Sequence, residues 1–172
     1  AIGRIYSASP QRGAGTPKPG KPDVFEAIAA AISTEEFDAC LEKLPTDMRT
    51  DQICIDDIAQ THARLKNIIF EATQRNNERA TDNDAGQQKS WKPRYHASFA
   101  SKYLHFHRPN LIPIYDGIAA KGLAWANGLK TNTRYQHNKK GYGLFCADWL
   151  DFAANFSECQ HKTDWHPRMI DT

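Results

Sequence analysis

Residues 93–126 read PRYHASFASKYLHFHRPNLIPIYDGIAAKGLAWA, and the order of helix-forming and helix-breaking residues in this stretch decides the fold. A leading proline suits the first turn of a helix, and aromatic residues at helical spacing extend that helix over residues 93–107. The prolines of residues 108–115 disfavour helix in the residues before them, which predicts a short extended connector. Asp116 then caps another helix that reaches about Asn127.

Helical periodicity continues on both sides of this stretch. Further helices are predicted over residues 23–33, 33–44, from about 51 or 55 to 79, and 142–156. No segment alternates apolar and polar residues over a run long enough to predict a β-sheet. Residues 1–22 are rich in Pro and Gly and are predicted to form an extended arm. We therefore predict a mainly α fold, a compact single-domain bundle of about six or seven helices over residues 23–172. His62 is predicted as a hydrogen-bonded histidine at the edge of the core.

Charge divides the chain into two unlike halves. Residues 1–86, which include the acidic helices 23–80, hold 10 Lys and Arg against 14 Asp and Glu, whereas residues 87–172 hold 12 against 6. Within residues 87–140 there is one acid, Asp116, and the net charge is +9. Positive charge concentrated in this way attracts polyanions, so we expect DNA or another nucleic acid to bind residues 87–140. The alternative is a basic surface that only aids solubility.

Composition excludes other classes of protein. The chain has 172 residues, 40% of them hydrophobic, and no apolar run approaches the ~18 residues of a bilayer span. Cys40, Cys54, Cys146 and Cys159 form no CxxC pair, which favours free thiols in a cytoplasmic protein, with Cys40 and Cys146 buried in apolar helical stretches. Because the sequence starts at Ala1 without Met and stops in an unfinished helical pattern, we expect a fragment.

Metal-ligating residues do not form a recognisable pattern. Cys159, His161 and His166 have spacings that match no zinc signature, and His105 and His107 alternate on their helix, so they cannot face one cleft. We therefore expect neither a metal nor a cofactor.

One stripe of the helix predicted over residues 93–107 combines groups that can do chemistry. At i, i+3 and i+4 spacing it carries Tyr95, Ser98, Lys102 and His105. If the stripe lines a cleft, Lys102 can serve as an amine nucleophile, and Asp116 can supply negative charge to a developing cation. Two simpler interpretations stay open: Asp116 as a helix cap only, and Lys102 as a structural or phosphate-binding side chain.

The run FASKYLHFHRPNLIPIYD at residues 99–116, followed by a helix, resembles bacterial proteins with the 8-oxoguanine DNA glycosylase fold, relatives of the helix-hairpin-helix glycosylase superfamily. The resemblance covers residues from about 90 to 126. It implies a helical body that holds a flipped base, an Asp at a helix start that assists cleavage of the N-glycosidic bond, and, in bifunctional members, a Lys that forms a Schiff base with the sugar. Asp116 matches the Asp position, and Lys102 is the candidate amine.

The sequence departs from the superfamily pattern in two ways. Residues 88–101 lack the glycines of the hairpin that binds phosphate, and Lys102 lies only 14 residues before Asp116, closer than in classical members. The resemblance therefore supports base release through Asp116 better than it supports lyase chemistry through Lys102.

A glycosylase also has to hold phosphates on both sides of an extruded nucleotide and stack its base. The basic candidates are Lys92, Arg94, Arg108, Arg134, Lys139 and Lys140. The aromatic candidates are Trp91, Tyr95, Tyr115 and Trp125. Trp91 and Tyr115 are favoured because they fall in predicted loops.

Two other functions fit the same residues. The first is a nucleic-acid-binding module without catalysis, and the second is a metal-independent ribonuclease in which His105 acts as acid or base beside Lys102.

Overall fold

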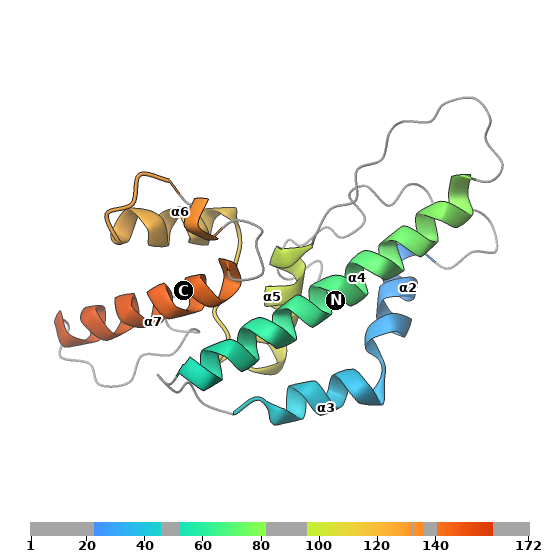
Figure 1. Ribbon diagram of the computed structural model, residues 1–172, viewed down its shortest axis with the longest axis horizontal. Helices are drawn as coiled ribbons and strands as arrows, with labels where there is room; N and C mark the ends of the chain where they lie inside the picture. The colour runs from blue at the N-terminus through green and yellow to red at the C-terminus, as the bar shows by residue number, and fades with distance from the viewer. Residues whose placement is uncertain (1–22, 46–51, 82–95, 132, 136–140, 160–172) are drawn as a thin grey trace.

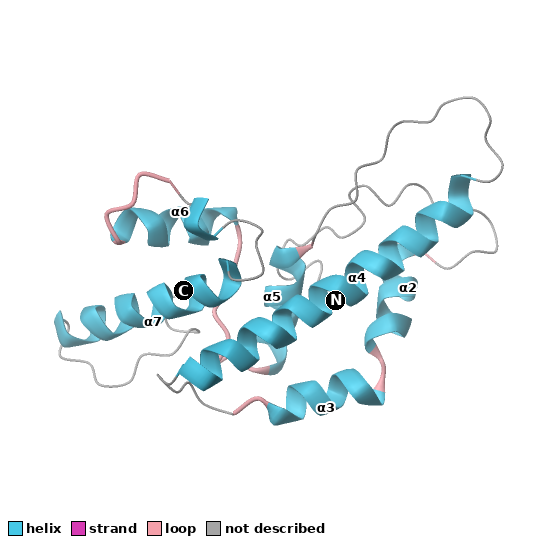
Figure 2. Cartoon of the chain, in the orientation of Figure 1, coloured by secondary structure: helices cyan, strands magenta, loops and turns pink. Residues whose placement is uncertain are grey.

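Every regular element that the structure describes is a helix. The structure is a computed structural model and describes residues 23–45, 52–81, 96–131, 133–135 and 141–159. Within these ranges it contains six α-helices, one 3₁₀-helix and no strand (Figures 1 and 2). The predicted mainly α, compact bundle is confirmed for this part of the chain. The predicted arm, residues 1–22, lies outside it.

The first two helices begin at side-chain caps. α2 (Val24–Ile32) has a capping box, because Asp23 Oδ1 accepts from the Glu26 backbone N–H at 2.8 Å and the Glu26 carboxylate accepts from the Asp23 N–H at 3.1 Å. α3 (Glu35–Lys43) starts after Thr34, whose hydroxyl accepts a backbone N–H at 3.3 Å. Each cap stabilises its helix by about 1 kcal/mol. The helices predicted over residues 23–33 and 33–44 are confirmed.

α4 (Gln52–Thr81) is the helix against which the others pack. It contacts α2, α3, α5 and α7, and Figure 1 shows it as the longest helix, running diagonally between α7 and α2. Ile58, Leu65 and Ile69 are at most 1% exposed. Their spacing places them along one buried face, as helical periodicity predicts. The helix continues to Thr81, two residues past its predicted end at residue 79.

His62 lies on the same face of α4 and fulfils its predicted role. Its Nε2 is 3.0 Å from the carbonyl oxygen of Ala97, and its ring stacks on Tyr142 with 3.8 Å between ring centroids. Burial, more than any other factor, lowers the pKa of His62 from 6.5 to about 4. The imidazole is therefore neutral at physiological pH.

α5 (Ala97–His107) begins later than the predicted residue 93. His96 has ψ of 54°, outside the helical region, and its side chain makes no capping hydrogen bond. The residues before it, 93–95, lie outside the described ranges. The connector over residues 108–115 contains no helix, as predicted from its prolines.

α6 (Gly117–Ala126) is capped by Asp116, as predicted, and ends before Gly128. Gly128 has φ of +70°, a left-handed conformation that glycine adopts without strain. Two apolar residues of this helix, Ile118 and Trp125, are 84% and 83% exposed. The buried residues of α6 are Ala120, Leu123 and Ala124.

The last described helix packs closely on α4. α7 (Gly141–Cys159) extends past both predicted ends, and a short 3₁₀-helix, η1 (Thr133–Tyr135), precedes it. A Cβ atom placed on Gly143 would lie 3.3 Å from the Cβ of Ala59 on α4. This glycine therefore allows the two helices to approach each other.

One hydrophobic core joins the acidic and basic halves. It includes buried residues of α2, α3 and α4 together with residues of α5, α6 and α7. In the described part of the chain, no helix has both the length and the apolar character needed to cross a membrane.

Candidate functional site

Lys102 and Asp116, the two principal candidates from the sequence, meet in the structure. Lys102 Nζ lies 3.4 Å from Asp116 Oδ2. The Lys102 side chain is 10% exposed and that of Asp116 is 31% exposed. The pair therefore lies at the boundary between the core and solvent, where α5 meets the start of α6.

The backbone of α6 holds Asp116 in its ionised form. Asp116 Oδ1 accepts hydrogen bonds from the N–H groups of Ile118 and Ala119, each at 2.9 Å. Partial burial alone would raise the pKa of Asp116, but these two hydrogen bonds and the nearby Lys102 ammonium together hold the pKa below its usual value of 3.8. Asp116 is therefore a carboxylate at neutral pH, with Oδ2 on the side of Lys102.

Ser101, which the sequence analysis did not single out, positions this pair. Its hydroxyl accepts the backbone N–H of Tyr115 at 3.0 Å and lies 3.0 Å from the carbonyl oxygens of both Tyr115 and Ser98. Since Ser101 precedes Lys102 and Tyr115 precedes Asp116, this contact sets the register between α5 and the end of the connector. No signal in the sequence distinguishes Ser101 from the other small residues of this helix, Ala97, Ser98 and Ala100.

His105 holds the middle of the connector. It is 5% exposed, and its Nδ1 lies 2.6 Å from the carbonyl oxygen of Ile112. A carbonyl oxygen only accepts, so Nδ1 carries the hydrogen. The ribonuclease interpretation needs a solvent-reachable His105, whereas the structure places this side chain in the interior. Tyr95, another member of the predicted stripe, lies outside the described residues, and Ser98 is half-buried.

Tyr115 belongs to an aromatic cluster beneath the connector. Its hydroxyl donates to the carbonyl oxygen of Tyr135 at 2.9 Å, and its ring meets Phe145 edge-on at 5.2 Å between centroids. Tyr142 closes the cluster by donating to the carbonyl oxygen of Pro113 at 2.9 Å. Tyr115 is thus half-buried, while Trp125, the less favoured aromatic candidate, faces solvent. Trp91 lies outside the described ranges.

The predicted phosphate-binding residues divide into two groups. Arg108 donates to the carbonyl oxygens of Leu41 and His107, at 3.1 and 3.0 Å, and Arg134 makes a bidentate pair with Asp148 at 2.8 and 3.1 Å. Both guanidinium groups thus already bind protein groups. The others, Lys92, Arg94, Lys139 and Lys140, lie outside the described residues.

One face of α6 combines a positive charge with exposed apolar groups. Ile118 and Trp125 are seven residues apart, so they lie on the same side of the helix, and exposed Lys121 lies between them. We call Ile118, Lys121 and Trp125 the α6 face. It starts two residues after Asp116. It was not recognised from the sequence, because helical periodicity does not show which side of a helix is covered by a neighbouring helix.

Within the described residues, no three or more His, Cys, Asp or Glu side chains are grouped so that they could hold a metal ion. The tail residues His161 and His166 lie outside those ranges. Comparison of the chain with family models, with curated proteins and with solved structures finds no match in any of the three.

Proposed function

We propose that this protein binds nucleic acid along the α6 face and releases a base by cleaving its N-glycosidic bond, with Asp116 as the catalytic carboxylate. The observation that carries the proposal is the partly exposed, ionised Asp116 beside Lys102 at the start of α6. As the bond breaks, positive charge develops on the sugar, and a fixed carboxylate stabilises that charge. The damaged or modified base is the substrate class, and DNA is the expected polymer.

In this proposal the α6 face binds the nucleic acid whose base is released. A flipped nucleotide leaves a gap in the base stack, and an exposed indole such as that of Trp125 can stack on a base. Lys121 adds a cation for a neighbouring phosphate. Both side chains are exposed, so they reach a polymer without rearrangement of the core.

The Lys102–Asp116 contact favours hydrolysis over lyase chemistry. An amine that attacks a sugar has to reach it, whereas the Lys102 side chain is 10% exposed and its Nζ lies 3.4 Å from Asp116 Oδ2. In this proposal Lys102 orients Asp116, and water completes the reaction.

The test is base release from duplexes that contain uracil, 8-oxoguanine or a modified cytosine. Asp116→Asn keeps an acceptor for the helix cap and removes the charge, so release should fall on the order of a hundredfold. Release that survives this substitution contradicts the proposal. Borohydride trapping should give no protein–DNA adduct; an adduct lost in Lys102→Ala and kept in Lys130→Ala would instead assign lyase activity to Lys102.

A second candidate is nucleic-acid binding without catalysis. It is favoured by the contacts of Asp116, whose Oδ1 already accepts two backbone N–H groups and whose Oδ2 faces Lys102. In that case the wild-type protein binds every duplex with an affinity that falls steeply with salt and releases no base.

A further inference from the structure

The exposed surface that includes the α6 face carries no acidic side chain. Residues 117–147 contain no Asp or Glu, and Lys121 and Lys130 are both exposed. Neither lysine forms an ion pair with another described residue. The acid that precedes them in the sequence, Asp116, already lies beside Lys102, with 3.4 Å between Oδ2 and Nζ. This surface is therefore positive, and an anion is the expected ligand.

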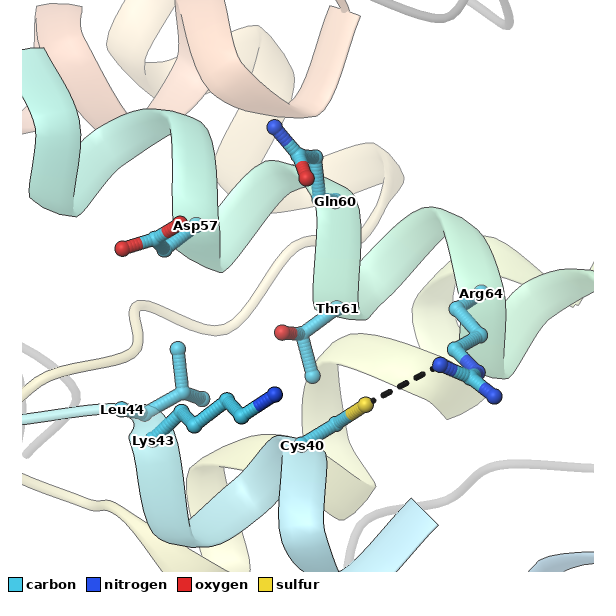
Figure 3. A pocket seen from close by; sticks show the side chains of 7 residues that line it. All are labelled: Cys40, Lys43, Leu44, Asp57, Gln60, Thr61 and Arg64. Atoms are coloured by element: carbon cyan, nitrogen blue, oxygen red, sulfur yellow. Dashed lines mark hydrogen bonds between the residues drawn. The ribbon is translucent and has the colours of Figure 1, made fainter. Parts of the chain in front are cut away.

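A cleft of about 490 Å³ between α3 and α4 suits an anionic ligand less well (Figure 3). Its lining includes the carboxylate of Asp57. The guanidinium of Arg64 already donates to Cys40 Sγ at 3.2 Å, as Figure 3 shows, and pairs with Glu36. An anionic polymer is thus expected at α6 and not at this cleft.

Ile118 and Trp125 lie on the same side of α6 with a gap between them. They are seven residues apart, which separates them by about 10.5 Å along the helix axis. Gly122 lies between them, and a Cβ atom placed there would have nothing within 4 Å. An exposed glycine inside a helix is less stable than alanine, and no described neighbour requires its small size. The gap allows a polymer to pass close to the helix backbone.

The side chains of the α6 face suit base stacking better than groove reading. A helix in the major groove of a duplex recognises base edges through several polar side chains, chiefly Arg, Asn and Gln, whereas the α6 face has Lys121. Its other members are the indole of Trp125, 83% exposed, and the side chain of Ile118, 84% exposed. Paired bases are covered by their neighbours in the stack, but unpaired bases leave their faces open to aromatic side chains. The α6 face therefore fits an unpaired strand.

Lys121 also distinguishes a strand from a second copy of the chain. A symmetric contact between two α6 faces would bring the two Lys121 ammonium groups toward each other, since the same patch is used by both copies. A phosphate group would instead meet this ammonium group with the opposite charge. The charge of the face thus favours nucleic acid over self-association.

We propose that the α6 face binds unpaired nucleotides, so that the substrate class is a single strand or a duplex with an unpaired segment. Trp125 stacks on one base, and Ile118 covers the face of a neighbouring base. Lys121 binds the phosphate between them, and Gly122 leaves room for the backbone of the strand. Asp116, two residues before Ile118, then lies at one end of the bound segment. This inference rests on the proposed function for the identity of the polymer, but strand preference tests it, whereas base release tests the proposed function.

The first experiment measures the affinity of the full chain for three labelled oligonucleotides of the same sequence, by fluorescence anisotropy at physiological ionic strength. They are a single strand, a fully paired duplex and a duplex with an unpaired internal loop. The single strand and the looped duplex should bind roughly 5- to 150-fold more tightly than the paired duplex, the range for one stacked base. A paired duplex that binds as tightly as the single strand, or no binding to any of the three, overturns the inference.

The same oligonucleotides, each with a damaged base, separate this inference from the proposed function. Tight binding to the single strand without base release contradicts the catalytic role of Asp116 and supports the strand preference. Base release with equal affinity for paired and unpaired strands contradicts the strand preference alone. Binding to vesicles of anionic phospholipid, with no oligonucleotide bound, would assign the face to a lipid surface and overturn the inference.

The second experiment tests the geometry of the face with variants. Trp125→Phe keeps an aromatic ring and should retain most of the preference for the single strand, whereas Trp125→Leu should lose it. Gly122→Leu fills the gap and should lower the affinity for the single strand severalfold without unfolding the protein, because the position is open. Ala30→Leu, at an exposed position on α2, is the matched control and should bind like wild type. An unchanged strand preference in Trp125→Leu, or an unchanged affinity in Gly122→Leu, contradicts the proposed contacts.

Discussion

The hydroxyl of Ser101 lies 3.0 Å from both the backbone nitrogen and the carbonyl oxygen of Tyr115. This contact joins α5 to the last residue of the connector, one position before each member of the Lys102–Asp116 pair. A change at Ser101 is thus expected to disturb the pair without removing either charge.

Ser101→Ala leaves the Tyr115 N–H without its partner in a region where Ser101 is fully buried. An unsatisfied buried donor costs roughly 1–3 kcal/mol of the free energy of unfolding. Denaturant unfolding measures this loss, and Ser98→Ala, at a half-buried position on the same helix, should cost less. Equal losses for the two variants would show that the Ser101–Tyr115 contact does not stabilise the connector.

Asp116 should make the stability of the protein depend on acid pH. Because its pKa is lowered on folding, its contribution is fully present above the unfolded-state pKa near 3.8 and is lost as the pH falls through the folded-state value. The difference in free energy of unfolding between wild type and Asp116→Asn should therefore shrink in strong acid. Asp116→Ala also loses the helix cap, a further cost of about 1 kcal/mol at neutral pH. A difference between wild type and Asp116→Asn that does not change with pH would contradict the folded-state shift.

His62 should produce a second, separate pH dependence. Its folded-state pKa of about 4 lies below the unfolded value of 6.5, so the unfolded chain binds the extra proton first. Stability is fully present above pH 6.5 and decreases by roughly 3 kcal/mol as the pH falls toward 4. Denaturant unfolding across this range should show the decrease in wild type. In His62→Gln the slope should be smaller, and an unchanged slope would assign the titration to another group.

Trp125→Ala should weaken nucleic-acid binding while leaving the fold intact. The indole is 83% exposed, so its removal should change the free energy of unfolding by less than about 0.5 kcal/mol. Loss of base stacking should reduce affinity by roughly 1–3 kcal/mol. Phe106→Ala, at an aromatic that is 53% exposed on α5, is the matched control and should bind like wild type.

Lys121 and Arg134 should differ in their effect on salt dependence. Lys121→Gln should reduce the slope of log affinity against log salt by about 1, the value for one phosphate contact. Arg134→Gln should leave the slope unchanged, because that guanidinium already pairs with Asp148. The reverse order of the two slopes would place the phosphates near η1 instead of α6.

The sequence was sufficient wherever one residue type determines a local structure. Asp23, Thr34 and Asp116 are short polar residues placed before apolar periodicity, and each caps the helix predicted to follow it. Lys102 and Asp116 were both candidates from the sequence, but their contact depends on how α5 and α6 pack, which the sequence did not specify.

Contacts between distant residues could not be predicted in this way. Ile118 and Trp125 have the spacing of a buried face, but the packing of α7 against the opposite side of α6 leaves them exposed. Cys40 reads as a small buried hydrophobe, but it is only partly buried and accepts a hydrogen bond from Arg64 on α4. The exposure of these side chains depends on which helix packs beside them, and no single segment of the sequence specifies that.

α4 separates acidic helices from the helix that carries Lys121. The acidic helices α2 and α3 lie across α4 from α6, as Figure 1 shows. Opposite charges separated in this way give the molecule a dipole moment. The field around a polyanion orients such a molecule before the two come into contact. If the protein binds nucleic acid as we propose, the side of Lys121 would face the strand, and the acidic helices would disfavour the reverse orientation.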